Sequence, residues 1–251
     1  MIKVITIITK FIVATLIALL FSSCNKYGII VDRFGKSITG SGTITTETRK
    51  IEGEFKSIRV NNAIDLVVEQ ADKTEITVEA DDNLQKEITT KVENGVLIIA
   101  CEYSSFINVK SRKVTVKIPV IEALQASSGS SIKSVDTLKG EAINVKASSA
   151  ADINLSLEFE SISCRASSGS TVNLNGKALE LLASSSSGST IKANELIVNT
   201  VKANASSGGE TNVHPMVNLF ANASSGGSVK YNTIPKNVTK NTSSGGSVNQ
   251  D

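Results

Sequence analysis

The chain has 251 residues, of which 40% are hydrophobic and only 4% aromatic, with no Trp. A core made of Ile, Val, Leu and Ala, beside abundant Ser and Thr, favours strands over helices. The formal net charge of +2 excludes the strongly basic footprint of a nucleic-acid-binding protein. The length allows one large domain or two small ones with a sizeable core.

Residues 1–23 have the features of an export signal. Lys3 and Lys10 are followed by an apolar run over residues 11–21, and two serines precede Cys24. The run is well short of the ~20 residues that cross a bilayer. Phe-Ser-Ser-Cys resembles a bacterial lipobox, which implies cleavage before Cys24 and lipidation of its thiol and amine, so that the lipid holds the protein on a membrane. A plain secretory signal or a membrane anchor is the alternative. Removing the signal takes away two bases and no acids, leaving 26 − 2 = 24 bases against 24 acids.

Residues 24–37 are interpreted as a tether and residues 38–118 as a β-rich, irregular cap. The cap contains several alternating, β-branched stretches, and Asn94-Gly95 between two of them is a strong hairpin signal. Three acids, Glu79, Asp81 and Asp82, gather in this region and are interpreted as solvated charges.

A serine-rich turn recurs seven times in residues 119–251. Its first serines are separated by 21, 19, 19, 20, 18 and 19 residues, and stand at Ser127, Ser148, Ser167, Ser186, Ser206, Ser224 and Ser243. Apolar and polar residues alternate on both sides of each turn, whereas no helical spacing is sustained. The pattern predicts an all-β fold, a right-handed parallel β-helix (solenoid) of about 19-residue coils stacked ~4.8 Å apart. Residues 38–251 then form one continuous domain.

Each turn is expected to be structural. The small residue before it fits a narrow cross-section, and stacked serine hydroxyls are expected to hydrogen-bond to one another or to the backbone along the ladder. Glycine allows the bend, and because Ala150 replaces it once, a positive φ is not expected to be required. The turn residues are Ser127, Ser128, Gly129, Ser148, Ser149, Ser167, Ser168, Gly169, Ser186, Ser187, Gly188, Ser206, Ser207, Gly208, Ser224, Ser225, Gly226, Ser243, Ser244 and Gly245.

No residue pattern indicates catalysis, a metal or a cofactor. His214 is the only histidine and lies beside a proline, which favours an exposed bend. Asp152 aligns with Thr171, Thr190 and Glu210, so no vertical pair of acids is evident, and the turns lack the repeated Asp of calcium-binding solenoids. The two remaining cysteines, Cys101 and Cys164, are expected to be buried free thiols.

Outward polar residues recur at coil spacing and are expected to form a binding face for glycans or proteins. They are Asn144, Lys146, Asn173, Lys192, Lys202, Asn204 and Asn222. The last coil ends without a cap, so its open edge is expected to allow self-association, with Lys236 and Lys240 as guards. Asp136-Thr137-Leu138 matches a short O-glycosylation pattern, and whether it is modified stays open.

These features together resemble the putative auto-transporter adhesin, head GIN domain family, common among Bacteroidetes lipoproteins. The resemblance runs from about Gly40 to the end. It rests on the seven turns and on Gly40-Ser41-Gly42 leading to Thr48-Arg49, Phe55 to Val60, Ala63 to Leu66, Val78 to Asn83 and Gly95 to Ile98. Family members commonly carry a Ser-Gly-Ala-Ser turn, and here the order shifts towards Ala-Ser-Ser-Gly. The resemblance implies a β-helical fold and an envelope address.

The sequence therefore predicts a non-catalytic envelope lipoprotein, anchored to the outer membrane, that acts as an adhesin or a scaffold. No acid closely follows Cys24, so the surface and the periplasm are both open as its location. The alternative function is a β-helical lyase or hydrolase acting on polysaccharides, whose acids meet only in three dimensions.

Overall fold

The computed structural model describes residues 36–251, so the expected signal, Cys24 and most of the tether lie outside the described residues. No helix in the described part is long and apolar enough to span a membrane. The strands are β1 (Ser37–Thr39), β2 (Ile44–Arg49), β3 (Ser57–Val60), β4 (Asp65–Gln70), β5 (Glu75–Asp81), β6 (Ile88–Glu93), β7 (Val96–Cys101), β8 (Ser105–Ile107), β9 (Arg112–Ile118), β10 (Ala123–Ala126), β11 (Ser131–Ser134), β12 (Leu138–Ala147), β13 (Asp152–Ala166), β14 (Thr171–Ser185), β15 (Thr190–Ala205), β16 (Glu210–Ala223), β17 (Ser228–Tyr231), β18 (Asn237–Thr242) and β19 (Ser247–Gln250). A 3-10 helix, η1 (Asp82–Leu84), follows β5.

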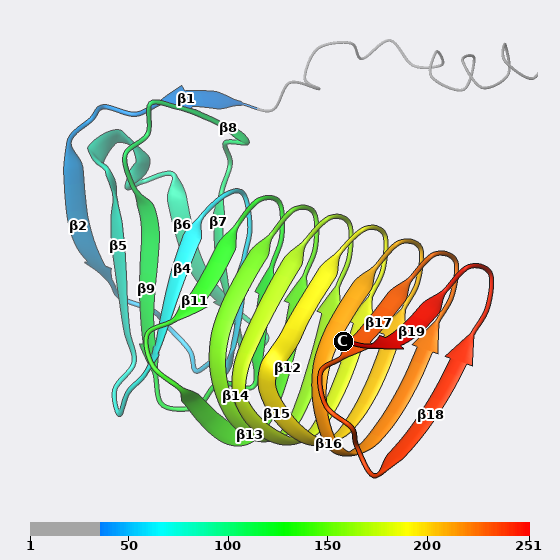
Figure 1. The fold of residues 1–251 in the computed structure, drawn as a ribbon. Coiled ribbons are helices and arrows are strands. Elements are labelled where there is room, and N and C mark those ends of the chain that lie inside the picture. Colours follow the sequence, from blue (N-terminus) through cyan, green and yellow to red (C-terminus); the bar gives the residue numbers. More distant parts are fainter. Residues whose placement is uncertain (1–35) are drawn as a thin grey trace, which may run out of the picture. The chain divides into compact units, whose positions relative to one another are not determined.

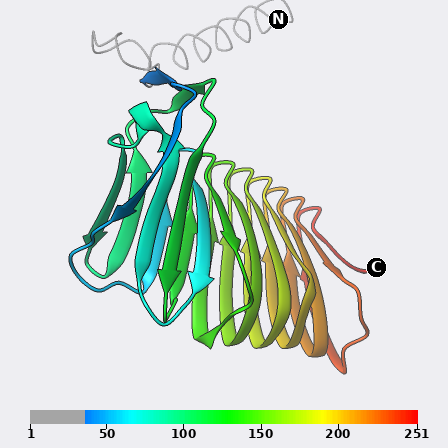
Figure 2. The same cartoon turned by 90° about the vertical axis from the view of Figure 1, so that its left-hand side faces the viewer.

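The predicted right-handed parallel β-solenoid is confirmed (Figures 1 and 2). The strand segments that lead into the serine turns pair in parallel, for example Ala126 with Ala147 and Ala147 with Ala166, and we call them the pre-turn sheet. The segments that leave the turns form the post-turn sheet, where Ile132 pairs with Ile153. Long strands such as β14 contribute to both sheets because they bend between them.

The region interpreted as a cap contributes two coils of its own. β3 and β4 pair in parallel with β10 and β11, so they form the coil below the first serine turn. Their connection has the same geometry, because Asn62 and Ala63 have φ of 62° and 56°, and Ala63 N–H donates to Ser128 O at 2.9 Å. β7 and β9 pair with β3 and β4 on the other side and form the coil beyond. The order of the first coils along the stack therefore differs from their order in the sequence.

The amino-terminal end of the stack is closed by antiparallel strands. β6 pairs with β7, β5 pairs with β9, and β2 pairs with β5. Asp81 ties this closure together because its carboxylate accepts N–H groups of Gly42, Lys110 and Ser111 at 2.8–3.0 Å. Asp81 is fully buried, so the expectation that this acid is a solvated charge is wrong.

The serine turns are tight and have two consecutive residues in the left-handed region. In the first turn, Ser128 and Gly129 have φ of 55° and 70°, and Ser130 N–H donates to Ser127 O at 3.3 Å. Ala150 has φ of 59°, so the expectation that a positive φ is not required there is wrong. Glycine suits this position because it adopts such a φ without a Cβ penalty.

Recurring backbone hydrogen bonds link successive turns. Gly129 N–H donates to Ser149 O at 3.0 Å, and the same bond recurs along the stack. The paired serines do not form the expected hydroxyl ladder, because the second serine of each pair is exposed. Serines just after the turns do bond to the preceding coil, since Ser170 Oγ donates to Ala147 O at 3.1 Å and Ser247 Oγ donates to Ser228 Oγ at 3.3 Å. Within residues 36–251, the only hydroxyl of a paired serine with a protein partner is that of Ser127, which bonds Asn61 Oδ1 at 2.6 Å. Exposed hydroxyls need no protein partner, since water satisfies them.

The core narrows along the stack. One inward row of the pre-turn sheet runs through Leu97, Ile58, Leu124, Val145, Cys164, Ala183, Ala203 and Ala221. Large side chains therefore give way to alanine towards the carboxyl end, and Cys164 fits between Val145 and Ala183 as a small hydrophobe. Cys101 and Cys164 are buried and free, as expected. Burial raises the pKa of the Cys164 thiol to about 12.

Candidate functional site

The seven residues expected to form one binding face lie on two sheets. Asn144, Lys146, Lys202, Asn204 and Asn222 belong to segments that lead into turns. Asn173 and Lys192, which pair with each other in β14 and β15, belong to segments that leave the turns. The pre-turn and post-turn sheets therefore each carry their own polar surface.

Two ladders of side-chain amides cross the last coils of the pre-turn sheet. In the first, Asn222 Nδ2 donates to Asn204 Oδ1 and Asn241 Nδ2 donates to Asn222 Oδ1, both at 2.9 Å. In the second, Asn237 donates to Asn218 Oδ1 at 2.9 Å and Asn218 donates to Thr200 Oγ1 at 3.1 Å.

Each middle asparagine, Asn218 or Asn222, donates one hydrogen bond and accepts one within its ladder. An amide has two N–H donors and two acceptor lone pairs, so a donor and an acceptor remain available on each. Because the side chains are already ordered, a ligand that used these groups would lose little of its binding energy to side-chain ordering.

Phe220 lies between the two ladders and is 43% exposed. It points outward because its neighbours Leu219 and Ala221 are both buried. Lys202 and Thr239 stand beside it in register on the adjacent coils. Sequence reasoning missed Phe220, although an aromatic residue in an outward slot of a strand is a visible signal. It also missed Asn241, which occupies the same slot as Asn222 one coil later.

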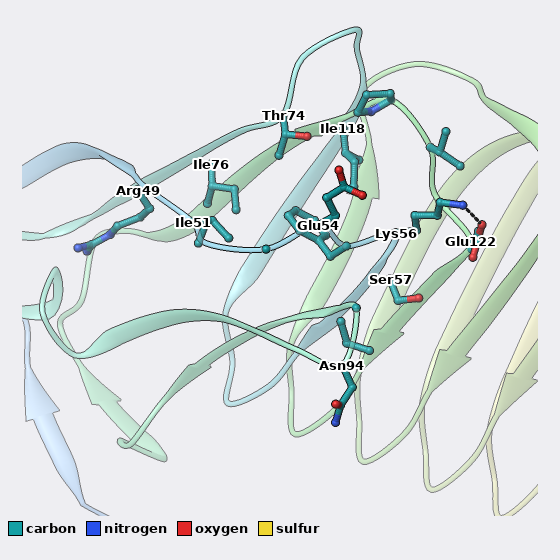
Figure 3. A pocket seen from close by; sticks show the side chains of 16 residues that line it. Arg49, Ile51, Glu54, Lys56, Ser57, Thr74, Ile76, Asn94, Ile118 and Glu122 are labelled. Atoms are coloured by element: carbon teal, nitrogen blue, oxygen red, sulfur yellow. Dashed lines mark hydrogen bonds and ion pairs between the residues drawn. The ribbon is translucent and has the colours of Figure 1, made fainter.

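A separate pocket of about 840 Å³ lies beside the connection between β2 and β3 (Figure 3). Ile51, Phe55, Ile76 and Ile118 give it an apolar lining. Figure 3 shows Glu54 among these side chains, and a 2.8 Å ion pair joins Lys56 and Glu122 at one side. The pocket combines an apolar wall with exposed charges, and no sequence pattern pointed to it.

Several carboxyl groups have a pKa that differs from the usual value. Among residues 36–251, every carboxyl whose pKa departs clearly from its usual value has that pKa lowered. A hydrogen bond from Lys113 lowers the pKa of Glu79, and one from Lys177 lowers the pKa of Glu158. A glycosidase needs one carboxylic acid with a raised pKa.

His214, Thr137 and Lys240 belong to neither asparagine ladder. His214 is half-buried at the bend, and its Nδ1 lies 3.1 Å from Asn194 O. Thr137 is exposed between β11 and β12. No three His, Cys, Asp or Glu side chains of the described chain come together as a metal site would require. At the open end, Lys240 Nζ lies 4.8 Å from the centre of the Tyr231 ring.

Residues 54–235 match the family model described as putative auto-transporter adhesin, head GIN domain. A putative adhesin from Bacteroides fragilis NCTC 9343 is 19% identical, with a TM-score of 0.78 over 85% of this chain and 100% of that chain. A putative adhesin from Parabacteroides merdae ATCC 43184 is 20% identical, with a TM-score of 0.67 over 86% of this chain and 99% of that chain.

A putative lipid binding protein from Parabacteroides distasonis ATCC 8503 is 21% identical, with a TM-score of 0.70 over 86% of this chain and 100% of that chain. At these identities the likeness shows the fold alone. A search of curated proteins finds no match. The family match covers well over half of the sequence, and the chain therefore belongs to the putative auto-transporter adhesin, head GIN domain family.

Proposed function

We propose that this chain is a non-catalytic lipoprotein of the cell envelope whose pre-turn sheet binds glycans. The observation that carries the proposal is the exposed Phe220 between two asparagine ladders. An aromatic face offers apolar contact to the C–H side of a sugar ring, while amides offer the paired donors and acceptors that hydroxyl groups need. Polar side chains repeat across this surface at coil spacing, which suits an extended ligand held by many weak contacts.

The binding proposal is tested on a glycan array with the wild-type protein and two variants. Phe220→Ala removes the aromatic face, and we expect it to lower binding at least tenfold, as the loss of a central aromatic anchor does. Ile197→Ala is the matched control, because Ile197 is 49% exposed but lies at the bend of the coil. Equal binding by all three proteins would place the glycan site elsewhere. A blank array would favour a scaffold role.

The envelope address rests on Cys24 and the export signal, which precede the described residues. We propose that lipidated Cys24 anchors the solenoid to the outer membrane. Protease shaving of intact and lysed cells, followed by blotting, tests which side it occupies. Loss from intact cells would support adhesion at the surface. Protection until lysis would assign the protein to the periplasm, as an envelope scaffold.

The alternative function, a polysaccharide lyase or hydrolase, predicts a different readout. Incubation of the purified protein with mixed polysaccharides would release reducing ends or unsaturated products. The lowered carboxyl pKa values and the paired state of Glu79, Glu158 and Glu210 disfavour that outcome. Release of products would replace the binding proposal with an enzymatic one.

A further inference from the structure

A second concave site lies on the other sheet. A cavity of about 300 Å³ opens on the post-turn sheet, where β9, β4 and β11 pair side by side. Val67 forms part of its lining and is only 9% exposed, although Val67 is flanked by the inward residues Leu66 and Val68 along the strand. Four cationic side chains line the cavity against one acid, Asp65. They are Lys110, Arg112, Lys113 and Lys133.

Two of these cations are committed to structural contacts. Lys110 Nζ donates to Gly42 O at 2.9 Å, and Lys113 Nζ pairs with Glu79 Oε2 at 2.7 Å. Asp65, the single lining acid, accepts a hydrogen bond from Ser131 Oγ at 2.6 Å. This hydrogen bond fills one acceptor position of the Asp65 carboxylate, so the lining carries four positive charges and one negative charge.

Arg112 and Lys133 have no anionic partner within residues 36–251. The Arg112 guanidinium lies 4.4 Å from the centre of the Phe106 ring, a stacked contact that leaves the in-plane N–H groups available. Within residues 36–251, neither the Arg112 nor the Lys133 side chain has a hydrogen-bond or ion-pair partner. The bases and acids predicted for the mature chain are equal in number, so this local excess does not reflect a generally basic protein.

We propose that this cavity binds an oxyanion group, the carboxylate of an acidic sugar or a phosphate, with Arg112 and Lys133 as its principal contacts. The guanidinium matches such groups with two parallel N–H donors, and the ammonium adds a point charge. A volume of about 300 Å³ is at the small end of ligand sites, which suits one acidic sugar or phosphorylated group. A concave wall strengthens the field of the cations.

The test is titration of the protein with glucuronate and, separately, with inorganic phosphate at constant ionic strength, followed by backbone amide NMR. We expect saturable shifts in residues 65–67, 109–113 and 131–133. Lys133→Ala and Arg112→Ala should each weaken the affinity about tenfold or more, as expected for a hydrogen bond to a charged group. Lys192→Ala is the matched control, because Lys192 lies in the same outward row as Lys133 but outside the cavity.

The outcomes distinguish an acidic sugar from a phosphorylated ligand, and a specific site from screening of surface charge. Saturation by glucuronate alone would identify an acidic sugar, and saturation by phosphate alone would identify a phosphorylated ligand. Shifts that chloride reproduces, or an equal effect of Lys192→Ala and Lys133→Ala, would overturn the proposal because they would reflect screening of surface charge. The result is independent of the glycan array, since Phe220 lies on the other sheet.

Discussion

The two ends of the solenoid are finished in different ways. At the amino-terminal end, antiparallel strands β6, β5 and β2 cover the first coils. At the carboxyl-terminal end, β18 and β19 pair only with the coil before them within the described chain. Every residue of β18 is exposed, whereas β7 next to the closure alternates between buried and half-buried residues. Stacked coils bury one another's faces, so the outermost coil benefits from a cap. Within the described chain, the amino-terminal end has such a cap.

The open end has a single charged residue where the other coils have apolar ones. Lys240 continues the inward row that ends in Ala203 and Ala221, and its ammonium lies over Tyr231. An inward charge on an edge strand discourages another strand from pairing there. We infer that the antiparallel closure stabilises the amino-terminal end, and we propose that Lys240 limits association at the other end.

The largest expected loss of stability comes from a substitution in the amino-terminal closure. Asp81→Asn replaces one carboxylate oxygen with an N–H₂ group facing backbone donors, and we expect a loss of about 3 kcal/mol in the free energy of unfolding. Asp82→Asn is the control, because Asp82 follows Asp81 directly in the chain and is exposed. Urea unfolding of both variants measures the difference, and equal midpoints would remove the structural role of Asp81.

The same carboxylate gives a pH dependence. Burial alone would raise the pKa of Asp81, but hydrogen bonds from the backbone N–H groups of Ser111, Gly42 and Lys110 lower it overall. A lowered pKa means that this contribution is present above about pH 4 and is lost as the pH falls through the folded-state pKa. Unfolding free energies measured from pH 6 downwards should therefore fall more steeply in the wild type than in Asp81→Asn, which keeps only the contributions of the other carboxyls with a lowered pKa, such as Glu79 and Glu158.

A moderate loss in the free energy of unfolding is expected from substitutions in the turns, and it should differ between an earlier turn and one near the carboxyl end. A Cβ at Gly227 would lie 2.4 Å from the backbone of Ala205, so Gly227→Ala should cost about 1–3 kcal/mol. Ser170 occupies the equivalent position in an earlier turn, where its hydroxyl donates to Ala147 O at 3.1 Å. Ser170→Ala should cost about 1 kcal/mol. Calorimetry measures both variants, and wild-type stability of Gly227→Ala would contradict this account.

A smaller effect on stability, with a larger effect on assembly, is expected at the open end. We propose that the last coil can self-associate and that Lys240 limits this association. Lys240→Leu should shift the protein towards dimers in sedimentation velocity, with a change of less than about 1 kcal/mol in unfolding free energy. Lys236→Leu is the control, because Lys236, which the sequence also suggested as a guard, lies in the connection before β18 and not on the edge strand itself. A strict monomer in both variants at high concentration would remove the proposal.

The smallest expected difference is in the reactivity of the two buried thiols. Burial is the main cause that raises the pKa of both Cys101 and Cys164, so neither should react with a thiol reagent near pH 8 in the native protein. Labelling then reports opening of the coils. We expect Cys164, in the middle of the stack, to be labelled more slowly than Cys101, and mass spectrometry of quenched samples measures both rates.

The repeat could be predicted because identical turns recur at a constant spacing, and the register between coils follows from that spacing. The order of the first coils could not, because β3–β4 and β7–β9 lack the serine motif and are stacked out of chain order. The burial of Asp81 was missed because its partners are backbone amides near residues 42 and 110, far away in sequence.

The candidate site was predictable in part. Alternation identified Asn204 and Asn222 as outward residues, which the structure places in one ladder. Alternation does not tell which outward residues share a sheet. Asn173 and Lys192 were therefore grouped with Asn204 and Asn222, although they belong to the post-turn sheet. The cavity beside Arg112 depends on a long connection between β7 and β9, which carries no repeat from which its path could be inferred.

The most direct test of the central proposal is NMR of the asparagine side-chain amides during titration with a glycan selected on the array. Binding at the ladders predicts shifts of the N–H₂ signals of Asn204, Asn222 and Asn241, with those of Asn173 and Asn212 unchanged. Shifts confined to Asn173 and Asn212, on the post-turn sheet, would contradict the proposal that glycans bind around Phe220.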